Sequence, residues 1–505
     1  MSEKFKRFQA GKQFFSSCPL YNKDNNIFNE LLEGKMVNYN TVTDNVIEEI
    51  KNAVSGKVYV GEEINIDFFH DEMPIYGEGQ PELVVDATNA EEIAKVVKIC
   101  NDNKIPVVPR GAGTGLTGAG VSRHGGVMIN MQSMNKILDY DEENMVVRVE
   151  PGVLLNDLAE DCLSRGYMYP PDPGEKFATL GGNVATNAGG MRAVKYGTTR
   201  NYVRSMEVVT PTGEITTFGA TVSKTSTGYS LKDLMIGSEG TLGIITELTL
   251  KIIPAPKETM SLIVPYEDLD TCISTVPQLF KANLNPQAIE FMEKEIVDMS
   301  EIYIGKSTFP KELEGIDIGA YLLITFDDED EDALNDIVEQ AAEVLMEAGA
   351  IDILVADTPN KMKEAWAARS SFLEAIESQT KLLDECDVVV PINMIAKYVH
   401  YVNERAKDFP FEVKSFGHAG DGNLHIYTCS NDMEKEEFIK QVDVFMNDIY
   451  KKAYEFGGQI SGEHGIGFGK KTFLHEFEGA VNTELMRGIK KVFDPNLILN
   501  PDKVV

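Results

Sequence analysis

The chain is predicted to be an α+β protein of two or three domains, and three observations support this. Its 505 residues exceed one ordinary domain, and a hydrophobic content of 43% is ample for a buried core. Short β-like runs alternate with helical patterns from residue 83 onward. The segment Pro254-Ala255-Pro256 then separates a glycine-rich half from a second half of longer strands and helices.

The individual elements follow from the spacing of apolar residues. A lead-in helix is predicted over 43–54, where Val46, Ile47, Ile50 and Val54 share one face. Further helices are predicted at 90–101, 332–348 and 361–378. Strands are predicted at 83–85, 105–109, 127–129, 145–149, 206–209, 243–246, 261–264 and 320–326. Between the last of these strands and the next helix, the acidic run 327–332 is predicted to be a solvated turn.

Composition excludes several classes of function. A net charge of −33 argues against a nucleic-acid partner, because phosphate binding requires clustered Lys and Arg. The six cysteines form no C-x-x-C pair, so neither a disulfide framework nor an iron–sulfur site is expected. No apolar run approaches 18 residues and no signal peptide is visible, which favours a cytoplasmic setting. The locally basic, aromatic residues 4–15 could contact a membrane surface or a partner, or simply pack on their own protein.

Two glycine-rich segments concentrate three of the seven histidines. The first runs from Phe416 to His425, and the second is Ser461-Gly462-Glu463-His464-Gly465. Tight backbone bends can bring imidazole and carboxylate groups together. His418, His425 and Glu463 would then form the ligand set of a catalytic divalent-metal site, with His464 as a candidate acid or base. The alternative is two structural loops with satisfied histidines.

Three further glycine-rich loops indicate a bulky, flat, phosphate-bearing ligand. They span residues 108–118, 169–190 and 237–246. Such loops expose backbone N–H groups and let the main chain approach a ligand closely. Gly113 to Gly118 matches G-x-G-x-x-G, but a second glycine-rich stretch and a strand follow instead of a helix, so an NAD-type Rossmann fold is rejected. The alternative is a run of tight turns.

These motifs together resemble those of a known family. The loop motifs are Arg110-Gly111-Ala112-Gly113-Thr114-Gly115, Pro171-Asp172-Pro173, Gly181-Gly182-Asn183, Asn187-Ala188-Gly189-Gly190, Tyr196-Gly197 and Glu239-Gly240-Thr241-Leu242-Gly243. They resemble the FAD-linked oxidase family with the vanillyl-alcohol-oxidase (PCMH-type) flavin fold. The two histidine segments and the segment from Asp494 to Pro501 are similar to its D-2-hydroxyacid dehydrogenase branch. That branch includes D-lactate dehydrogenases, the glycolate oxidase flavin subunit and D-2-hydroxyglutarate dehydrogenase.

The resemblance covers residues 77–505 and implies a domain plan. It implies a PCMH-type FAD-binding domain of two α/β subdomains at 77–255, preceded by an N-terminal extension and lead-in helix at 1–76. An α+β cap domain built on an antiparallel sheet would occupy 256–480 and carry the metal site. A C-terminal segment at 481–505 would return to the FAD domain.

The resemblance also implies roles for individual residues. FAD would contact residues of the glycine-rich loops and two asparagines: Arg110, Gly111, Ala112, Gly113, Thr114, Gly115, Pro171, Asp172, Thr179, Gly181, Gly182, Asn183, Asn187, Gly189, Gly190, Tyr196, Gly197, Glu239, Gly240, Gly243, Ile244, Ile245, Asn423 and Asn500. No His or Cys lies between Arg110 and Val121, so non-covalent FAD is expected. His418, His425 and Glu463 would bind Zn²⁺, Mn²⁺ or Fe²⁺. Arg369 would bind the substrate carboxylate, and His464 would take the hydroxyl proton.

The substrate expectation is D-lactate, with glycolate and D-2-hydroxyglutarate as alternatives. Leu373 lies one turn after Arg369, and the acidic run Asp384-Glu385-Cys386-Asp387 would repel a second carboxylate; only Lys381 is basic there. Electrons would pass to an electron-transferring flavoprotein or an iron–sulfur subunit. Two rival functions stay open at this point: a metal hydrolase, and a non-catalytic flavoprotein that serves in assembly.

Overall fold

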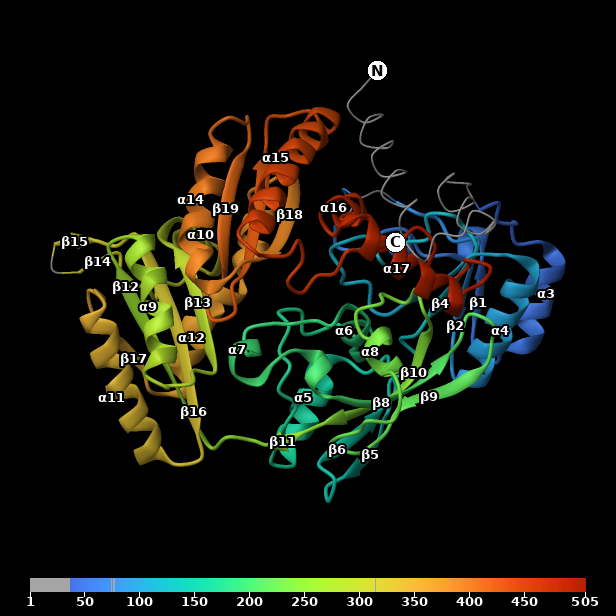
Figure 1. Ribbon diagram of the computed structural model, residues 1–505, viewed down its shortest axis with the longest axis horizontal. Coiled ribbons are helices and arrows are strands. Elements are labelled where there is room, and N and C mark those ends of the chain that lie inside the picture. The colour runs from blue at the N-terminus through green and yellow to red at the C-terminus, as the bar shows by residue number, and fades with distance from the viewer. Residues whose placement is uncertain (1–36, 74, 76–77, 314) are drawn as a thin grey trace. The chain divides into compact units, whose positions relative to one another are not determined.

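A computed structural model of the protein describes residues 37–73, 75, 78–313 and 315–505 (Figure 1). The contacts of the chain separate residues 1–39 from residues 40–505, and the described helices and strands all belong to the second unit. The basic aromatic segment 4–15 lies outside the described residues. Within the described part of the chain, no helix combines the length and the apolar character that crossing a membrane requires.

The first sheet is small and mostly parallel. Its strand order is β1 (Val58–Val60), β2 (Leu83–Asp86), β4 (Val127–Asn130) and β3 (Val107–Arg110). Strands β2 and β3 both run parallel to β4, and β1 is antiparallel to β2. Helix α3 (Asp44–Ala53) precedes the sheet, and α4 (Ala90–Asn103) connects β2 to β3. Short 3-10 turns η1 (Gly61–Glu63) and η2 (Ile66–Phe68) follow β1.

The chain passes from β3 to β4 through loop 111–126, in which the described residues contain no helix. A Rossmann fold would require a helix there, so its rejection is confirmed.

The second sheet is antiparallel throughout. Its order is β5 (Ile137–Asp141), β6 (Val146–Val149), β10 (Ile244–Lys251), β8 (Val203–Val209) and β9 (Ile215–Gly219). The associated short elements are α5 (Leu155–Ser164), α6 (Leu180–Thr186), α7 (Ala193–Tyr196), η4 (Thr199–Asn201), α8 (Leu231–Met235) and the β7 (Tyr167–Met168)–β11 (Ile253–Pro254) pair. Leu158 of α5 and Leu180 and Val184 of α6 pack with Val208 and Leu248 in one core. This packing fixes the loops on either side of α6.

The third sheet has seven antiparallel strands. Its order is β17 (Leu354–Ala356), β12 (Glu258–Tyr266), β16 (Ala320–Asp328), β13 (Ala288–Glu293), β19 (Glu412–His418), β20 (Asn423–Ser430) and β18 (Leu382–Val389). A separate β14 (Glu312–Leu313)–β15 (Ile316–Asp317) hairpin precedes β16 in the chain. The predicted antiparallel sheet of the second half is therefore confirmed, although its strands are longer than predicted.

Helices pack on both faces of this sheet. One face buries side chains against α9 (Leu269–Lys281), α11 (Glu331–Glu347), α14 (Ile395–Ala406) and α15 (Lys435–Glu455). The other buries side chains against α10 (Lys294–Ile304), α12 (Pro359–Ser370) and α13 (Phe372–Glu377). The remaining elements are η5 (Ile392–Met394), α16 (Lys471–Phe477) and α17 (Gly479–Phe493). The single helix predicted over 361–378 is thus two helices, because the backbone leaves helical geometry at Ser371.

Asp327 corrects the predicted solvated turn. Strand β16 continues through Asp328, so Asp327 is buried instead of lying in the acidic turn. Its carboxylate accepts hydrogen bonds from the hydroxyl of Tyr196 at 2.7 Å and the amide of Gln287 at 2.5 Å, and it pairs with Lys195. The remaining acidic residues, 329–332, do form the turn and the start of α11.

The C-terminal residues pair with the first sheet. The N–H of Val107 in β3 donates to the carbonyl of Ile498 at 2.8 Å, and the N–H of Asn500 donates back to Val107 at 2.7 Å. Lys503 donates to the carbonyl of Val121 at 2.9 Å. These bonds join the end of the chain to the strand that leads into the first glycine-rich loop. The limits of the four predicted parts stay predictions.

Candidate active site

One cavity of about 550 Å³ brings the glycine-rich loops and the histidine cluster together. Its lining includes these predicted residues: Arg110, Gly111, Ala112, Gly113, Thr114, Gly115, Thr179, Gly181, Gly182, Asn183, Glu239, Gly240, Gly243, Ile244, Ile245, Arg369, His418, His425, Glu463 and His464. The volume lies in the range of small-molecule and cofactor sites.

The first loop is shaped by one arginine. The Arg110 guanidinium donates to the carbonyls of Gly120 at 3.0 Å, Asp67 at 2.9 Å and His70 at 2.8 Å. Gly113 has a φ of +85°, and a Cβ there would lie 2.1 Å from the Arg110 guanidinium. The side chain of Arg110 therefore holds the loop, and the main chain of 111–115 forms the cavity wall.

Asp71 is a cavity residue that sequence reasoning missed. Its carboxylate accepts the N–H of Gly118 at 2.6 Å and that of Met73 at 3.1 Å. Burial raises the pKa of Asp71 to about 6. No motif surrounds Asp71, so the sequence contains no signal that would have identified it.

The second loop enters the short helix α6. Thr179 caps this helix by accepting the N–H of Gly182, and Asn187 ends it in the left-handed conformation. The Asn187 side chain accepts the hydroxyl of Thr198 at 3.2 Å and the N–H of Arg200 at 3.0 Å. Asn187 is thus a structural residue of the turn, and the cavity wall is made by its neighbours in α6.

Nine predicted FAD contacts are not among the described residues that line the cavity: Pro171, Asp172, Asn187, Gly189, Gly190, Tyr196, Gly197, Asn423 and Asn500. Asp172 pairs with Arg192 at 3.2 Å, and a Cβ on Gly190 would lie 2.1 Å from the Asp172 carbonyl oxygen. Tyr196 bonds to Asp327. These contacts place Asp172, Gly190 and Tyr196 behind the wall, where they hold its shape.

The two asparagines brace neighbouring segments. The amide of Asn500 donates to the carbonyls of Glu239 at 2.7 Å and Ala119 at 3.0 Å. The amide of Asn423 donates to Asp387 at 2.7 Å and to the carbonyl of Val388 at 3.0 Å. Both asparagines therefore connect elements that shape the site.

The histidine cluster is built on one face of the seven-stranded sheet. Glu290 lies opposite His418, and His425 lies opposite both Phe416 and Asp387. Since side chains alternate along a strand, His418 and His425 share a face with Glu290, Glu385 and Asp387. The intervening residues Cys386, Val388, Leu424 and Ile426 point into the core on the other face.

Three imidazoles converge on Glu463. The Nε2 atoms of His418, His425 and His464 lie 3.6, 3.4 and 3.5 Å from Glu463 Oε1. The two Nε2 atoms of His418 and His425 are 3.3 Å apart. The structure therefore brings together the three predicted metal ligands and the predicted base.

Glu290 holds both a ligand and the predicted carboxylate-binding arginine. Its Oε1 lies 2.7 Å from His418 Nδ1, and its Oε2 accepts from Arg369 Nε at 2.8 Å. Burial opposes protonation of His418, but the Glu290 carboxylate outweighs burial and raises the pKa of His418 well above its ordinary value. A metal ion would replace the Nε2 proton of His418, and with the other proton held on Nδ1 by Glu290 the Nε2 lone pair would face His425 and Glu463.

The donor set fits a divalent metal. Glu290 directs the lone pair of His418 Nε2 toward His425 Nε2, and burial lowers the pKa of His425, which favours the neutral ring. Glu463 Oε2 is buried without a hydrogen-bond partner among the described residues. One ligand atom each from His418, His425 and Glu463 lies within 4.8 Å of the others. A cation between these atoms would satisfy all of them.

Asp387 shapes the turn that carries Glu463 and His464. Its Oδ2 accepts the N–H groups of Gly462 at 3.0 Å, Glu463 at 3.0 Å and His464 at 2.8 Å, and the hydroxyl of Ser461 at 2.7 Å. One buried carboxylate therefore fixes the backbone of the whole motif. This is the structural basis of the Ser-Gly-Glu-His spacing.

The acidic run 384–387 was predicted to repel a second substrate carboxylate, and the structure does not support that role. Glu385 and Asp387 are buried and are not among the described cavity residues. Their charges face His464, the 461–464 turn and the buried Lys470, so they do not repel a substrate carboxylate through the cavity. The signal was present as Glu385 and Asp387 at i and i+2, the spacing that puts both on one face of a strand.

Glu239 ties the third glycine-rich loop to the histidine segment. Its carboxylate accepts the N–H of Ile466 at 2.7 Å and that of Gly467 at 2.8 Å. Burial raises the pKa of Glu239 to about 7. Its carboxylate thus joins the two walls of the cavity.

Comparison with known proteins matches both halves of the chain. Residues 81–219 match a family model described as an FAD binding domain, and residues 255–504 match the C-terminal domain of FAD linked oxidases. A D-lactate dehydrogenase of Anaerostipes hadrus is 66% identical over 92% of this chain and 98% of its own length. The glycolate oxidase subunit GlcD of Bacillus subtilis (strain 168) is 36% identical over 86% of this chain and 91% of its own.

A solved structure shows the same fold. p-Cresol methylhydroxylase with substrate bound superposes with a TM-score of 0.73 at 18% identity, over 92% of this chain and 97% of that one. The predicted PCMH-type fold is therefore confirmed.

Proposed function

Because this chain belongs to the family of FAD-linked oxidases, we propose that it is a dehydrogenase that oxidises a D-2-hydroxyacid, with D-lactate favoured, to the 2-keto acid. The proposal includes non-covalent FAD and a divalent metal. The observation that carries it is the convergence of three imidazole Nε2 atoms and Glu463 on the wall of a cavity that the glycine-rich loops also line.

The loops fit FAD. Residues 111–115 and 181–183 line the wall, and Gly113 has a positive φ that L-residues with side chains rarely adopt. When bound, FAD would accept the hydride from the hydroxyl-bearing carbon. No His or Cys lies between Arg110 and Val121 to bond it covalently. Flavin that stays with acid-precipitated protein would contradict the non-covalent assignment.

His418, His425 and Glu463 would hold the metal. Two imidazole nitrogens and one carboxylate oxygen suit Zn²⁺, Mn²⁺ or Fe²⁺. When bound, such a metal would polarise the substrate hydroxyl and lower its pKa.

The remaining residues orient the substrate and move its proton. His464 Nε2 faces the same point as the ligand atoms and would take the hydroxyl proton. Arg369 lines the cavity beside His418, and both are held by Glu290. Its guanidinium would bind the substrate carboxylate.

The cavity favours a monocarboxylate. Among the described lining residues, the cationic side chains of Lys and Arg are limited to Arg369 and Arg110, and the Arg110 guanidinium is bonded to carbonyls of the loop. Leu373 lines the wall one turn after Arg369, and several acidic residues line it further on: Asp71, Glu72, Glu175, Glu374 and Glu377. A second carboxylate would find no free cation there and would be repelled. The 66% identity to a D-lactate dehydrogenase supports the same choice.

Electrons would leave through a partner protein. Five cysteines of the described chain are buried singly, so no cluster ligand set is available among them. An electron-transferring flavoprotein or an iron–sulfur subunit would reoxidise the flavin. Rapid turnover with oxygen alone, unaffected by any partner protein, would contradict this part of the proposal. A cytoplasmic location remains a prediction.

The test is anaerobic flavin absorbance during addition of D-lactate, before and after EDTA treatment. We expect bleaching near 450 nm that EDTA abolishes and a divalent metal restores, with L-lactate as the control. Higher kcat/KM on D-2-hydroxyglutarate or glycolate would overturn the substrate choice. A colourless protein would favour a metal hydrolase, and flavin that no hydroxyacid reduces would favour a non-catalytic flavoprotein.

A further inference from the structure

We propose that Glu385 is a positioning residue that orients His464, with Lys470 as its counter-charge. The inference rests on the proposed function, because it assigns His464 a directed role as base. Neither Glu385 nor Lys470 is among the described residues that line the cavity. Both would therefore act through His464 without touching substrate.

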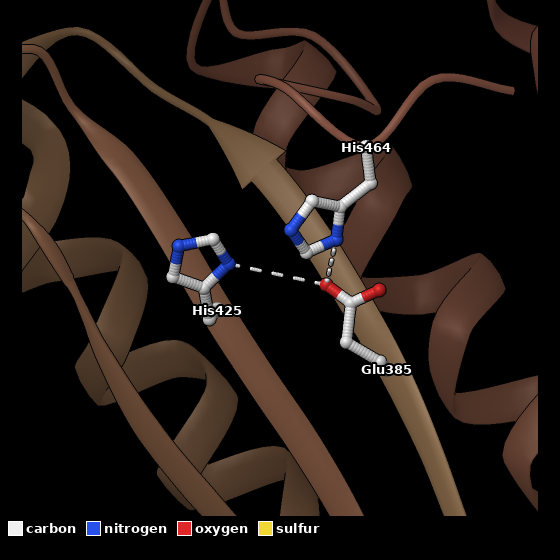
Figure 2. Close-up of side chains that lie close together, drawn as sticks. All are labelled: Glu385, His425 and His464. Carbon is white, nitrogen blue, oxygen red and sulfur yellow. Dashed lines mark ion pairs between the residues drawn. The ribbon is translucent and has the colours of Figure 1, made fainter. Parts of the chain in front are cut away.

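Glu385 lies between the two imidazoles (Figure 2). Its Oε1 is 2.9 Å from His464 Nδ1 and 3.9 Å from His425 Nδ1, and the carboxylate is fully buried. The two rings stack with centroids 5.2 Å apart and an interplanar angle of 19°. Each ring thus has Glu385 on its Nδ1 side and Glu463 on its Nε2 side.

This arrangement selects one orientation of His464. At 2.9 Å, His464 Nδ1 and Glu385 Oε1 form an ion pair, and neither atom has a hydrogen-bond partner of good geometry among the described residues, so each depends on the other for its charge. Burial opposes protonation of His464, but Glu385 and Asp387 outweigh burial and raise the pKa of His464 well above its ordinary value. A cation bound beside Glu463 would favour loss of the Nε2 proton, and the Nε2 lone pair would then point into the cavity with Nδ1–H toward Glu385. A flipped ring would place carbon against Glu385 and leave its buried charge unsatisfied. Glu385 therefore sets both the ring orientation and the tautomer.

Glu385, His425 and His464 could instead hold a second metal ion, because one ligand atom from each lies within 4.8 Å of the others. Lys470 argues against this. Its side chain is 1% exposed, and its Nζ lies 3.9 Å from Glu385 Oε2 and 3.8 Å from Asp387 Oδ2. A divalent cation at Glu385 would meet a buried ammonium at short range, where repulsion is poorly screened. Lys470 therefore already supplies positive charge to both Glu385 and Asp387.

Two carboxylates of β18 thus have separate roles. Asp387 holds the backbone of residues 462–464 through three N–H groups, and Glu385 holds the His464 ring. A change at Glu385 should therefore leave the turn, Glu463 and the metal in place. This separation makes the inference testable apart from folding.

The experiment compares Glu385→Gln with the wild type and with His464→Gln, all as holoenzymes. We expect Glu385→Gln to lower kcat for D-lactate roughly 10- to 100-fold, with KM within about 3-fold and FAD and metal content unchanged. The isotope effect from D₂O should rise, because proton removal becomes slower, and the isotope effect from 2-deuterated D-lactate should not rise, because C–H cleavage then limits kcat less. In a protein that already carries His464→Gln, adding Glu385→Gln should lower kcat by less than about a further 3-fold, because the effects of residues that act through one another are non-additive.

A matched control is Glu301→Gln. Glu301 is also a buried glutamate paired with a lysine, Lys311 at 2.6 Å, but it lies outside the described cavity wall. It should leave both isotope effects unchanged. If Glu385→Gln folds poorly, Glu385→Asp keeps the charge beside Lys470 but withdraws the carboxylate from His464 Nδ1, and it should show a similar loss of kcat.

The outcomes separate the two claims. If D-lactate bleaches the wild-type flavin but kcat is unchanged in Glu385→Gln, the inference is overturned and the proposed function is not. Loss of a metal ion in Glu385→Gln would show that Glu385 is a metal ligand and would also overturn it. An equal loss of kcat in the His464→Gln background would mean that Glu385 does not act through His464. A wild-type flavin that no hydroxyacid bleaches overturns the proposed function, and the inference with it.

Discussion

The glycine-rich loops and the histidine cluster line the same cavity but are built in opposite ways. The loops present main chain, and their shape depends on local features such as the positive φ of Gly113 and the Arg110 guanidinium beside it. The cluster presents side chains from β18, β19 and β20 and from the 461–465 turn. It depends on residues distant in the chain: Glu290 is 128 residues from His418, and Asp387 is 77 residues from His464.

Because of this difference, substitutions in the two regions should have different effects. A substitution in a loop should act through steric fit and should mainly cost FAD binding. A substitution in the cluster should act through charge balance, because each carboxylate there is buried against a cation or an N–H group. The following predictions test that separation, beginning with the largest expected effect.

Glu463→Gln should abolish the metal site while sparing the loops. One of three protein ligands loses its charge, so we expect metal content to fall and kcat with D-lactate to drop at least about 10³-fold. FAD should remain bound at the wild-type ratio. The measurements are metal analysis, flavin absorbance and anaerobic bleaching. Glu476→Gln, on α16, is the control, and concurrent loss of FAD would break the proposed separation.

Asp387→Asn should loosen the Ser-Gly-Glu-His turn. The amide cannot replace a charged oxygen that accepts three N–H groups and a hydroxyl, and Lys470 would lose a counter-charge. We expect about 3 kcal/mol lower unfolding free energy, together with weaker metal binding. Urea unfolding of the holoenzyme measures the first effect. Asp443→Asn, exposed on α15, provides the control, and equal stability of the two variants would refute the assignment.

Glu239 joins the two regions and should make their connection pH-dependent. Its pKa is raised to about 7 in the folded protein, above its ordinary value of 4.5. The unfolded chain therefore releases this proton first as pH rises. The contribution of Glu239 to stability should fall between about pH 4.5 and 7 and then level off, by at most about 3 kcal/mol. Glu239→Gln should flatten this part of the curve of unfolding free energy against pH; parallel curves would contradict it.

Gly113→Ala should damage the loop alone. A Cβ would lie 2.1 Å from the Arg110 guanidinium at a φ of +85°. We expect a loss of about 1–2 kcal/mol in unfolding free energy and a lower FAD-to-protein ratio, with metal content unchanged. Gly488→Ala is the matched control, because a Cβ in that part of α17 meets nothing within 4 Å and should stabilise the helix slightly. Equal FAD-to-protein ratios in the two variants would count against a role of this loop in binding FAD.

The sequence by itself determined the features that depend on local chemistry. Gly113 and Gly240 marked the cavity wall, because both take a positive φ that favours glycine. Apolar periodicity located α3, α4, α11 and the eight predicted strands, but it did not locate β18, β19 and β20. His418, His425, Glu463 and His464 were identified from two short segments, and the structure brings all four to one point.

Only the tertiary structure decided which charges face which. Sequence order could not show that Glu290 pairs with His418 and Arg369, or that Asp387 holds the 461–464 turn, because strand register sets those contacts. For the same reason Asp327 and Glu385 were assigned to solvent and to the substrate, whereas both are buried. Alternation along a strand predicts that two residues share a face, but the packing of the sheet decides whether that face meets water, substrate or another buried charge.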